Sequence, residues 1–221
     1  MITIKALNEE GSDSSDSQSQ SVGITREAQE EGLNQMYSDA LKSLSSGDED
    51  SARQILMKLN DHLNSKTINQ KVPLVHQLKY LTLKNLGLIC KKNSINYLLD
   101  ALEIDPSDVT IWLKTGNKAA QTGDYLLARN CYEEAHKLSP QNWIAIDRLL
   151  DAYFILHDLY SCFLLCCESL DMDSGYRKAQ ILINEICKLH PPMIKEMKGA
   201  KEKYKRLLTD QEDEEYKHVI G

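Results

Sequence analysis

Glycine and proline are scarce in this chain, which has ten glycines and five prolines among 221 residues. Sandwiches, barrels and collagen-like chains need more of these residues for their turns or repeats, so the composition disfavours all three classes. Hydrophobic residues nevertheless make up 42% of the chain, which is enough for a packed core. We therefore expect a mostly helical protein that forms one domain or one short repeat array.

Long apolar segments are missing too. The nearest approach, at residues 162–167, falls far short of the roughly 18 residues that a membrane helix needs. The first residues are interrupted by charge and lack a small-residue cleavage site, so they do not resemble a secretory leader. Six cysteines in such a chain predict a reducing compartment. We expect a soluble protein without a membrane partner.

The chain has fewer basic than acidic residues. Its 26 lysines and arginines and 33 aspartates and glutamates give a formal net charge of −7. Nine of the acidic residues lie in two short segments, at 9–16 and 210–215, and removing them leaves +2 for the remainder. Binding to a phosphate backbone needs clustered lysine and arginine. Direct nucleic-acid binding is therefore not expected.

Motifs for catalysis and cofactor binding are also missing. The chain has no glycine-rich phosphate loop, no Gly-x-Ser-x-Gly and no His-Glu-x-x-His. We expect neither enzymatic activity nor a cofactor nor a small-molecule substrate. Cys162, Cys166 and Cys167 lie near His157, but no Cys-x-x-Cys or His-x-x-x-His pair accompanies them. We interpret them as small hydrophobic residues of a helical core in preference to metal ligands.

Two kinds of pattern divide the N-terminal part of the chain. Residues 9–24 are rich in serine and acidic residues and have almost no apolar side chains, so we interpret 1–24 as an N-terminal segment with a disordered acidic linker. From Thr25 onward, apolar residues recur every three or four positions and predict helices. Gly47 and Asp48 interrupt this periodicity, which predicts a helical hairpin within residues 25–64.

A repeat of fixed period decides the fold class. The segment ending at Pro106 recurs in the segment ending at Pro140, 34 residues later. This is the period of tetratricopeptide repeats, helical hairpins that stack into a solenoid. Residues 109–142 match the motif at nine positions: Trp112, Gly116, Gly123, Tyr125, Ala128, Tyr132, Ala135, Leu138 and Pro140. We predict an all-α solenoid in which small residues mark helix crossings, aromatic residues fill the space between helices, and Pro140 ends the second helix.

The other units follow with less regularity. We predict repeats at about 25–64, 78–108 and 143–176, a capping helix at 177–190, an array that ends near 192, and a charged helix with an acidic tail at 193–221. The distance from Leu83 to Pro106 is 23 residues, against 28 from Trp112 to Pro140, so we expect shortened helices in the second unit. Residues 64–77, which include Pro73, are interpreted as an insertion.

The concave face of such a stack is lined by the first helix of each hairpin and is the expected partner-binding surface. In the best repeat it includes Asn117, and in the next one it includes Asp147, Asp151 and Phe154. Two carboxylates with apolar neighbours suit a basic or amphipathic peptide. A solvated face without a partner is an equally open interpretation.

A chaperone adaptor is the alternative function. Adaptors of this type grip a C-terminal carboxylate of Hsp70 or Hsp90 with Lys, Asn, Asn, Lys and Arg at set positions across three repeats. The corresponding residues here are Lys84, Leu88, Lys114, Ile144 and Arg148. Two of the five positions agree, which makes a poor clamp.

The order of the segments carries more information than the repeats alone. The octet MITIKALN at 1–8 and the acidic serine-rich gap precede TREAQE at 25–30, LKYLTLKNL at 78–86, DVTIWLKTG at 108–116 and LARNCYEE at 127–134. Together these segments resemble the N-terminal region of the calcineurin-binding protein cabin family. That family supplies the large tetratricopeptide scaffold subunit of the HIRA (HIR) histone chaperone complex. The resemblance covers residues 1 to about 192.

The resemblance implies a non-catalytic nuclear scaffold in chromatin. Its partners would be HIRA and ubinuclein-type subunits, and indirectly histone H3.3–H4, in replication-independent nucleosome assembly and transcription regulation. Family members are far longer and bind calcineurin near their distant C-terminus, so calcineurin binding does not follow for this chain. A fragment, a short isoform and a reduced paralogue are all compatible with the sequence, as are different oligomeric states and direct or indirect histone contact.

Overall fold

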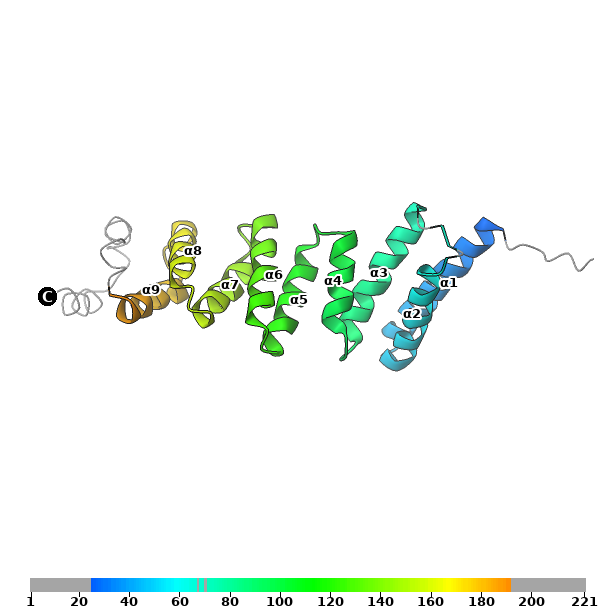
Figure 1. Ribbon diagram of the computed structural model, residues 1–221, viewed down its shortest axis with the longest axis horizontal. Coiled ribbons are helices and arrows are strands. Elements are labelled where there is room, and N and C mark those ends of the chain that lie inside the picture. Colours follow the sequence, from blue (N-terminus) through cyan, green and yellow to red (C-terminus); the bar gives the residue numbers. More distant parts are fainter. Residues whose placement is uncertain (1–24, 67, 70, 192–221) are drawn as a thin grey trace, which may run out of the picture.

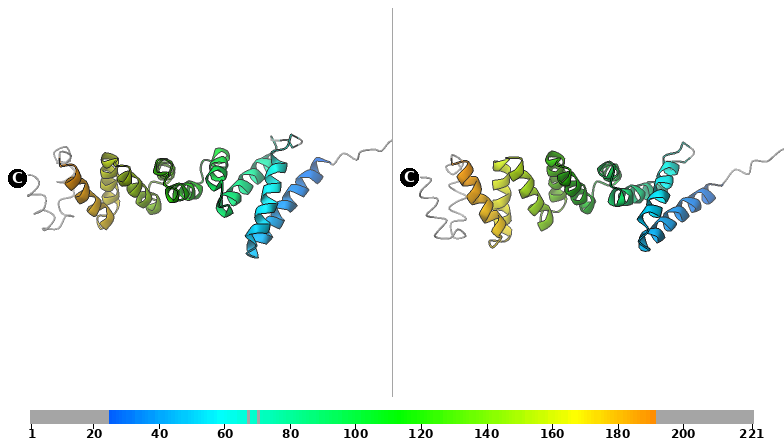
Figure 2. Two further views of the ribbon diagram at one scale, coloured as in Figure 1. Left: turned by 60° about the horizontal axis from the view of Figure 1, so that its bottom comes forward. Right: turned by 90° about the horizontal axis from the view of Figure 1, so that it is seen from below.

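The computed structural model describes residues 25–66, 68–69 and 71–191, and every regular element within these ranges is a helix. In chain order they are α1 (Arg26–Ser45), α2 (Glu49–Leu63), α3 (Pro73–Ile89), α4 (Ser94–Ile104), α5 (Val109–Gln121), α6 (Tyr125–Leu138), α7 (Trp143–Ile155), α8 (Leu159–Met172) and α9 (Arg177–Leu189). The hairpins α1–α2, α3–α4, α5–α6 and α7–α8 follow one another along the long axis, with α9 after them (Figures 1 and 2). Each helix chiefly contacts the helices before and after it.

The same turn recurs in three hairpins. Its first residue has a positive φ, and the aspartate that follows caps the second helix by accepting a hydrogen bond from a main-chain N–H. The carboxylate satisfies a free donor and lies at the positive end of the helix dipole. The three turns are Gly47-Asp48, Gly123-Asp124 and His157-Asp158.

The hydrophobic core is a row of clusters along the stack. The largest cluster runs from α5 to α9. At the N-terminal end, Ala40 of α1, Leu56 of α2 and Leu86 of α3 are fully buried against one another, so a single cluster joins the first hairpin to the second. A neighbouring cluster adds Leu59 and Leu63 of α2 and the first apolar residues of α3.

The two helices of the third hairpin cross at a glycine. A Cβ atom at Gly116 of α5 would lie 2.5 Å from Cε1 of Tyr132 on α6, so only glycine leaves room for the aromatic ring. Ala128 and Ala135 lie on the same buried face of α6 as Tyr132. Trp112 donates a hydrogen bond from Nε1 to the main-chain oxygen of Pro106 at 2.8 Å, which ties α5 to the preceding connection.

The second hairpin differs from the expectation of shortened helices. Its second helix, α4, is short at 11 residues, but α3 has 17 and begins at Pro73, inside the predicted insertion. Proline is well suited to the first helical position, and the early residues Val75 and Leu78 bury their side chains against α1 and α2. The missing residues near 91–93 therefore shorten one helix only. The predicted linker at 1–24 and the predicted charged helix and tail at 193–221 lie outside the described residues.

Candidate functional site

The predicted groove residues lie on the first helices of two successive hairpins, and all four are half-buried. Asn117 is on α5, where its Oδ1 accepts a hydrogen bond from the hydroxyl of Tyr132 at 2.8 Å. Phe154 is near the end of α7 and packs against the largest core cluster. Asp147 and Asp151 are one turn apart on α7. Asn117 and Phe154 thus have internal structural contacts before any partner is considered.

Both carboxylates of α7 contact one lysine of α9. The ammonium of Lys178 lies 2.8 Å from Oδ1 of Asp147 and 2.8 Å from Oδ1 of Asp151. Lys178 also donates a hydrogen bond to the main-chain oxygen of Asp147 at 2.8 Å. The hydroxyl of Tyr176 donates a hydrogen bond to Oδ1 of Asp147 at 3.1 Å. We call Asp147, Asp151, Tyr176 and Lys178 the α7–α9 ion cluster. Partial burial raises the pKa of Asp147. The charge of Lys178 and the hydrogen bonds from Lys178 and Tyr176 lower it by more, so the pKa lies below its usual range.

The α7–α9 ion cluster reduces the attraction that the groove has for a basic peptide. Two carboxylates and one ammonium leave a formal charge of −1, and the positive charge of Arg148 also acts on Asp147. A basic ligand would have to displace Lys178 from side chains that already hold it. The immediate role of the two carboxylates is to fix α9 against α7. Each pair is partly exposed and contributes under about 1 kcal/mol.

Acid should loosen the contact between α7 and α9. The pKa of Asp147 is lower in the folded protein than in the unfolded chain, so its stabilising contribution is complete above about pH 4 and is lost as the pH falls through the folded pKa. Asp147→Asn should remove this dependence, so its unfolding temperature should fall less steeply below pH 4 than that of the wild type. Thermal unfolding followed by circular dichroism between pH 2 and 6 measures both slopes.

Asp100→Asn is the matched control for this experiment, because Asp100 is an exposed carboxylate on α4 that forms no ion pair within the described ranges. Its pH dependence should follow that of the wild type. Identical slopes for the wild type and Asp147→Asn would contradict a stabilising role for the α7–α9 ion cluster.

A second contact of the same kind, which the sequence reasoning missed, joins α3 to α5. The ammonium of Lys84 lies 2.7 Å from Oδ2 of Asp108, and the hydroxyl of Tyr80 donates to the same oxygen at 2.5 Å. Asp108 also caps α5 through the main-chain N–H of Ile111. Partial burial raises the pKa of Asp108, but these hydrogen bonds lower it by more. Asp108 is 24 residues from Lys84 and 28 from Tyr80, and it caps the first helix of the next hairpin, so no motif pointed to this contact.

This second contact bears on the chaperone-adaptor alternative. Lys84 is one of the two residues that agree with the carboxylate clamp, and its hydrogen bond with Asp108 raises the pKa of its ammonium group. Gripping the C-terminal carboxylate of a chaperone would therefore require Lys84 to leave Asp108. The geometry does not favour the adaptor function.

The cysteines are packed as core residues. Cys162 and Cys166 are fully buried in α8, and all six cysteines are free thiols. A hydrogen bond with Cys162 and burial raise the pKa of the Cys166 thiol far above its usual range. Among the described residues, no group of three or more His, Cys, Asp or Glu side chains could hold a metal ion. None of the helices in these same ranges is both long and apolar enough to cross a bilayer.

Comparison with known protein sequences points to one family. The family model of the CABIN1 N-terminal domain matches residues 30–188. Calcineurin-binding protein 1 of Arabidopsis thaliana is 30% identical over 176 residues, which cover 73% of this chain and 9% of that protein. The chain therefore spans less than a tenth of the length of this relative.

Solved structures share the arrangement of the helices. A tetratricopeptide repeat protein from Parabacteroides merdae superposes with a TM-score of 0.56 at 17% identity, over 80% of this chain and 64% of that one. The MamA protein superposes with a TM-score of 0.54, also at 17% identity, over 80% of this chain and 93% of that one. At this level of identity the likeness concerns the fold alone. The prediction of an all-α tetratricopeptide solenoid is confirmed.

Proposed function

The chain belongs to the CABIN1 N-terminal domain family, and from this membership we propose that it is a non-catalytic scaffold of a nuclear HIRA-type histone chaperone complex. A tetratricopeptide stack of this family is a protein-interaction scaffold. The proposed partners are HIRA and ubinuclein-type subunits, with histone H3.3–H4 reached through them. The proposed process is replication-independent nucleosome assembly. The observation that carries the proposal is the family match across residues 30–188.

The proposed partner-binding surface is the face of α5 and α7 that carries Asn117, Asp147, Asp151 and Phe154. Because Lys178 already neutralises much of the acidic charge there, apolar side chains should supply most of the affinity. Ile144, on the first turn of α7, is 60% exposed and has the size of an anchoring residue. A partner would bury Ile144 together with the exposed part of Phe154.

Co-purification from nuclei tests the proposal. The tagged chain should recover HIRA and ubinuclein-type subunits from a nuclear extract. Ile144→Glu should reduce this recovery about tenfold or more, since a buried apolar anchor replaced by a charge costs on the order of 2 kcal/mol. Quantitative mass spectrometry of the captured proteins measures the change.

Tyr160→Glu is the matched control, because Tyr160 is also 60% exposed but lies on α8, the second helix of its hairpin. It should leave the recovery unchanged. Recovery of Hsp70 or Hsp90 in place of HIRA-complex subunits would overturn the proposed function. Equal losses for both variants would overturn the proposed location of the surface.

A further inference from the structure

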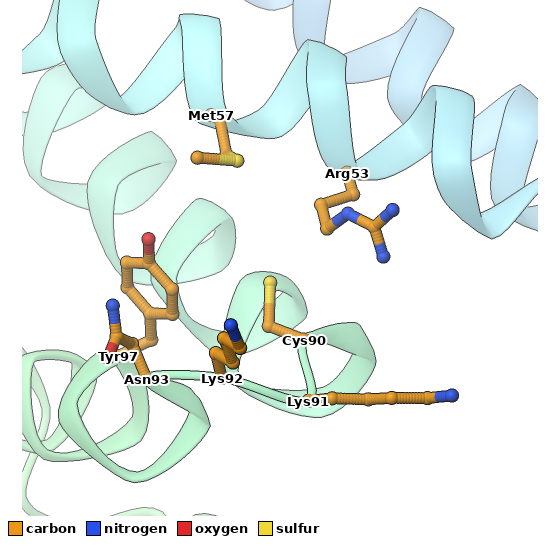
Figure 3. A pocket seen from close by; sticks show the side chains of 7 residues that line it. All are labelled: Arg53, Met57, Cys90, Lys91, Lys92, Asn93 and Tyr97. Atoms are coloured by element: carbon orange, nitrogen blue, oxygen red, sulfur yellow. The ribbon is translucent and has the colours of Figure 1, made fainter.

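A pocket of about 280 Å³ lies between α2 and the connection from α3 to α4. Figure 3 shows Arg53 and Met57 projecting from α2 toward this connection, with the sulfur of Cys90 directed back toward α2. Lys91 and Lys92 follow Cys90, and Tyr97 of α4 closes the opposite side. Met57 is 45% exposed and Tyr97 is half-buried, so the pocket offers apolar surface beside its positive charges.

The pocket results from the short second helix of this hairpin. α4 has 11 residues, whereas α6 and α8 have 14 each, and the missing residues fall at the start of α4. A second hollow of about 660 Å³ flanks the same connection on the side of α5, where Lys118 and Gln121 line it. The two hollows share Cys90, Lys91 and Asn93. The connection is thus bordered by open space on both sides.

Four cations surround this connection, and we call Arg53, Lys91, Lys92 and Lys118 the basic elbow. Arg53 pairs with the exposed Asp50, whereas the three lysines have no ion-pair partner in the described part of the chain. The turn into α4 also lacks the capping aspartate that precedes α2, α6 and α8, since Asn93 stands there without a side-chain cap. The positive charge of the basic elbow is therefore largely uncompensated.

Two charges of the basic elbow, from different helices, act on the thiol of Cys90. Burial raises the pKa of the Cys90 thiol, and the positive charges of Arg53 and Lys118 act in the opposite direction. Arg53 lies on α2 and Lys118 on α5, so the two helices that flank the connection direct positive charge to the same position. A ligand there would meet cations from both sides.

We propose that the basic elbow and its pocket bind an acidic segment of a partner protein that also carries an apolar side chain. Carboxylates of the segment would pair with Lys91, Lys92 and Arg53, and the apolar side chain would lie between Met57 and Tyr97. A nucleic acid fits less well, because the pocket is small and partly apolar while the chain as a whole carries a net charge of −7. This site is independent of the α5–α7 face and of the HIRA-type complex proposed above.

Fluorescence anisotropy with a labelled 12-residue peptide of alternating glutamate and leucine tests the proposal on the full chain. Lys91→Glu with Lys92→Glu should weaken binding about tenfold or more, since two attractive contacts become repulsive. Met57→Ser should lower the affinity for this peptide, whereas the affinity for a peptide of glutamate and serine should not change. The affinity should also fall as salt rises from 50 to 300 mM.

Lys66→Glu with Lys71→Glu is the matched control, since both lysines are exposed, lie outside the pocket and give the same change in net charge. It should retain wild-type affinity, and circular dichroism should show equal helix content in all variants. Equal weakening by both double variants would overturn the proposal, because the effect would then be one of overall charge. Stronger binding of a DNA or RNA oligonucleotide at the same lysines would overturn it in favour of a nucleic-acid site.

Discussion

Replacing Gly116 with valine should destabilise the protein by about 3 kcal/mol, at the upper end of the cost of overpacking a core. A Cβ at this position would lie 2.5 Å from Cε1 and 2.8 Å from Cδ1 of Tyr132, and valine adds two more carbons. The ring has no room to move away, because Tyr132 is 3% exposed and its hydroxyl is held by Asn117. Urea unfolding followed by circular dichroism measures the change.

Gly32→Val is the matched control, since a Cβ at Gly32 in α1 would meet nothing within 4 Å. Valine is a slightly better helix former than glycine, so this variant should be neutral or more stable by a few tenths of a kcal/mol. If Gly116→Val does not accumulate as a folded protein, Gly116→Ala provides a milder test and should still be less stable than the wild type. An unchanged urea midpoint for both Gly116 variants would contradict the tight crossing of α5 and α6.

Replacing Leu86 with alanine should cost about 2–5 kcal/mol through lost burial and the cavity left behind. Leu86 is fully buried in α3 against Ala40 and Leu56, and this cluster joins the first hairpin to the second. Leu88→Ala is the matched control, because Leu88 lies on the same helix but is 38% exposed. It should cost under about 1 kcal/mol.

The damage from Leu86→Ala should also be local. In a repeat stack each unit is stabilised by its immediate neighbours. Weakening one interface should therefore first unfold the units next to it. Amide hydrogen exchange should therefore accelerate in α1 and α2 well before it does in α7 to α9. Uniform acceleration along the described helices would contradict this expectation and indicate a single cooperative core.

The sequence predicted the fold class because tetratricopeptide hairpins depend on residues at fixed spacing. Gly116, Tyr132 and the turn at Gly123 belong to one hairpin and lie at the spacings that the tetratricopeptide motif sets within it, so they can be recognised without the structure. The family resemblance came from the order of several short segments and is confirmed by the matches. Both inferences used information that is local in the chain.

The sequence alone did not predict the contacts that join different repeats. The count between Leu83 and Pro106 revealed that residues were missing, but it could not assign the loss to one helix, and α3 proved to be long. Lys178 contacts α7 from a position 31 residues after Asp147, with no fixed spacing to suggest it. The basic elbow likewise depends on where α2 and α5 place Arg53 and Lys118 beside the connection.

Contact between neighbouring helices also determines how the chain can fold during synthesis. Each helix packs chiefly on its neighbours in the chain, so α1 and α2 already have most of their partners once α3 has left the ribosome. Contacts that are short in sequence favour rapid folding, and translation at about 5–20 residues per second allows ample time for each hairpin to form. The apolar face of the last folded helix is exposed only until the next helix emerges and packs on it. The stack can therefore fold from the N-terminus one hairpin at a time.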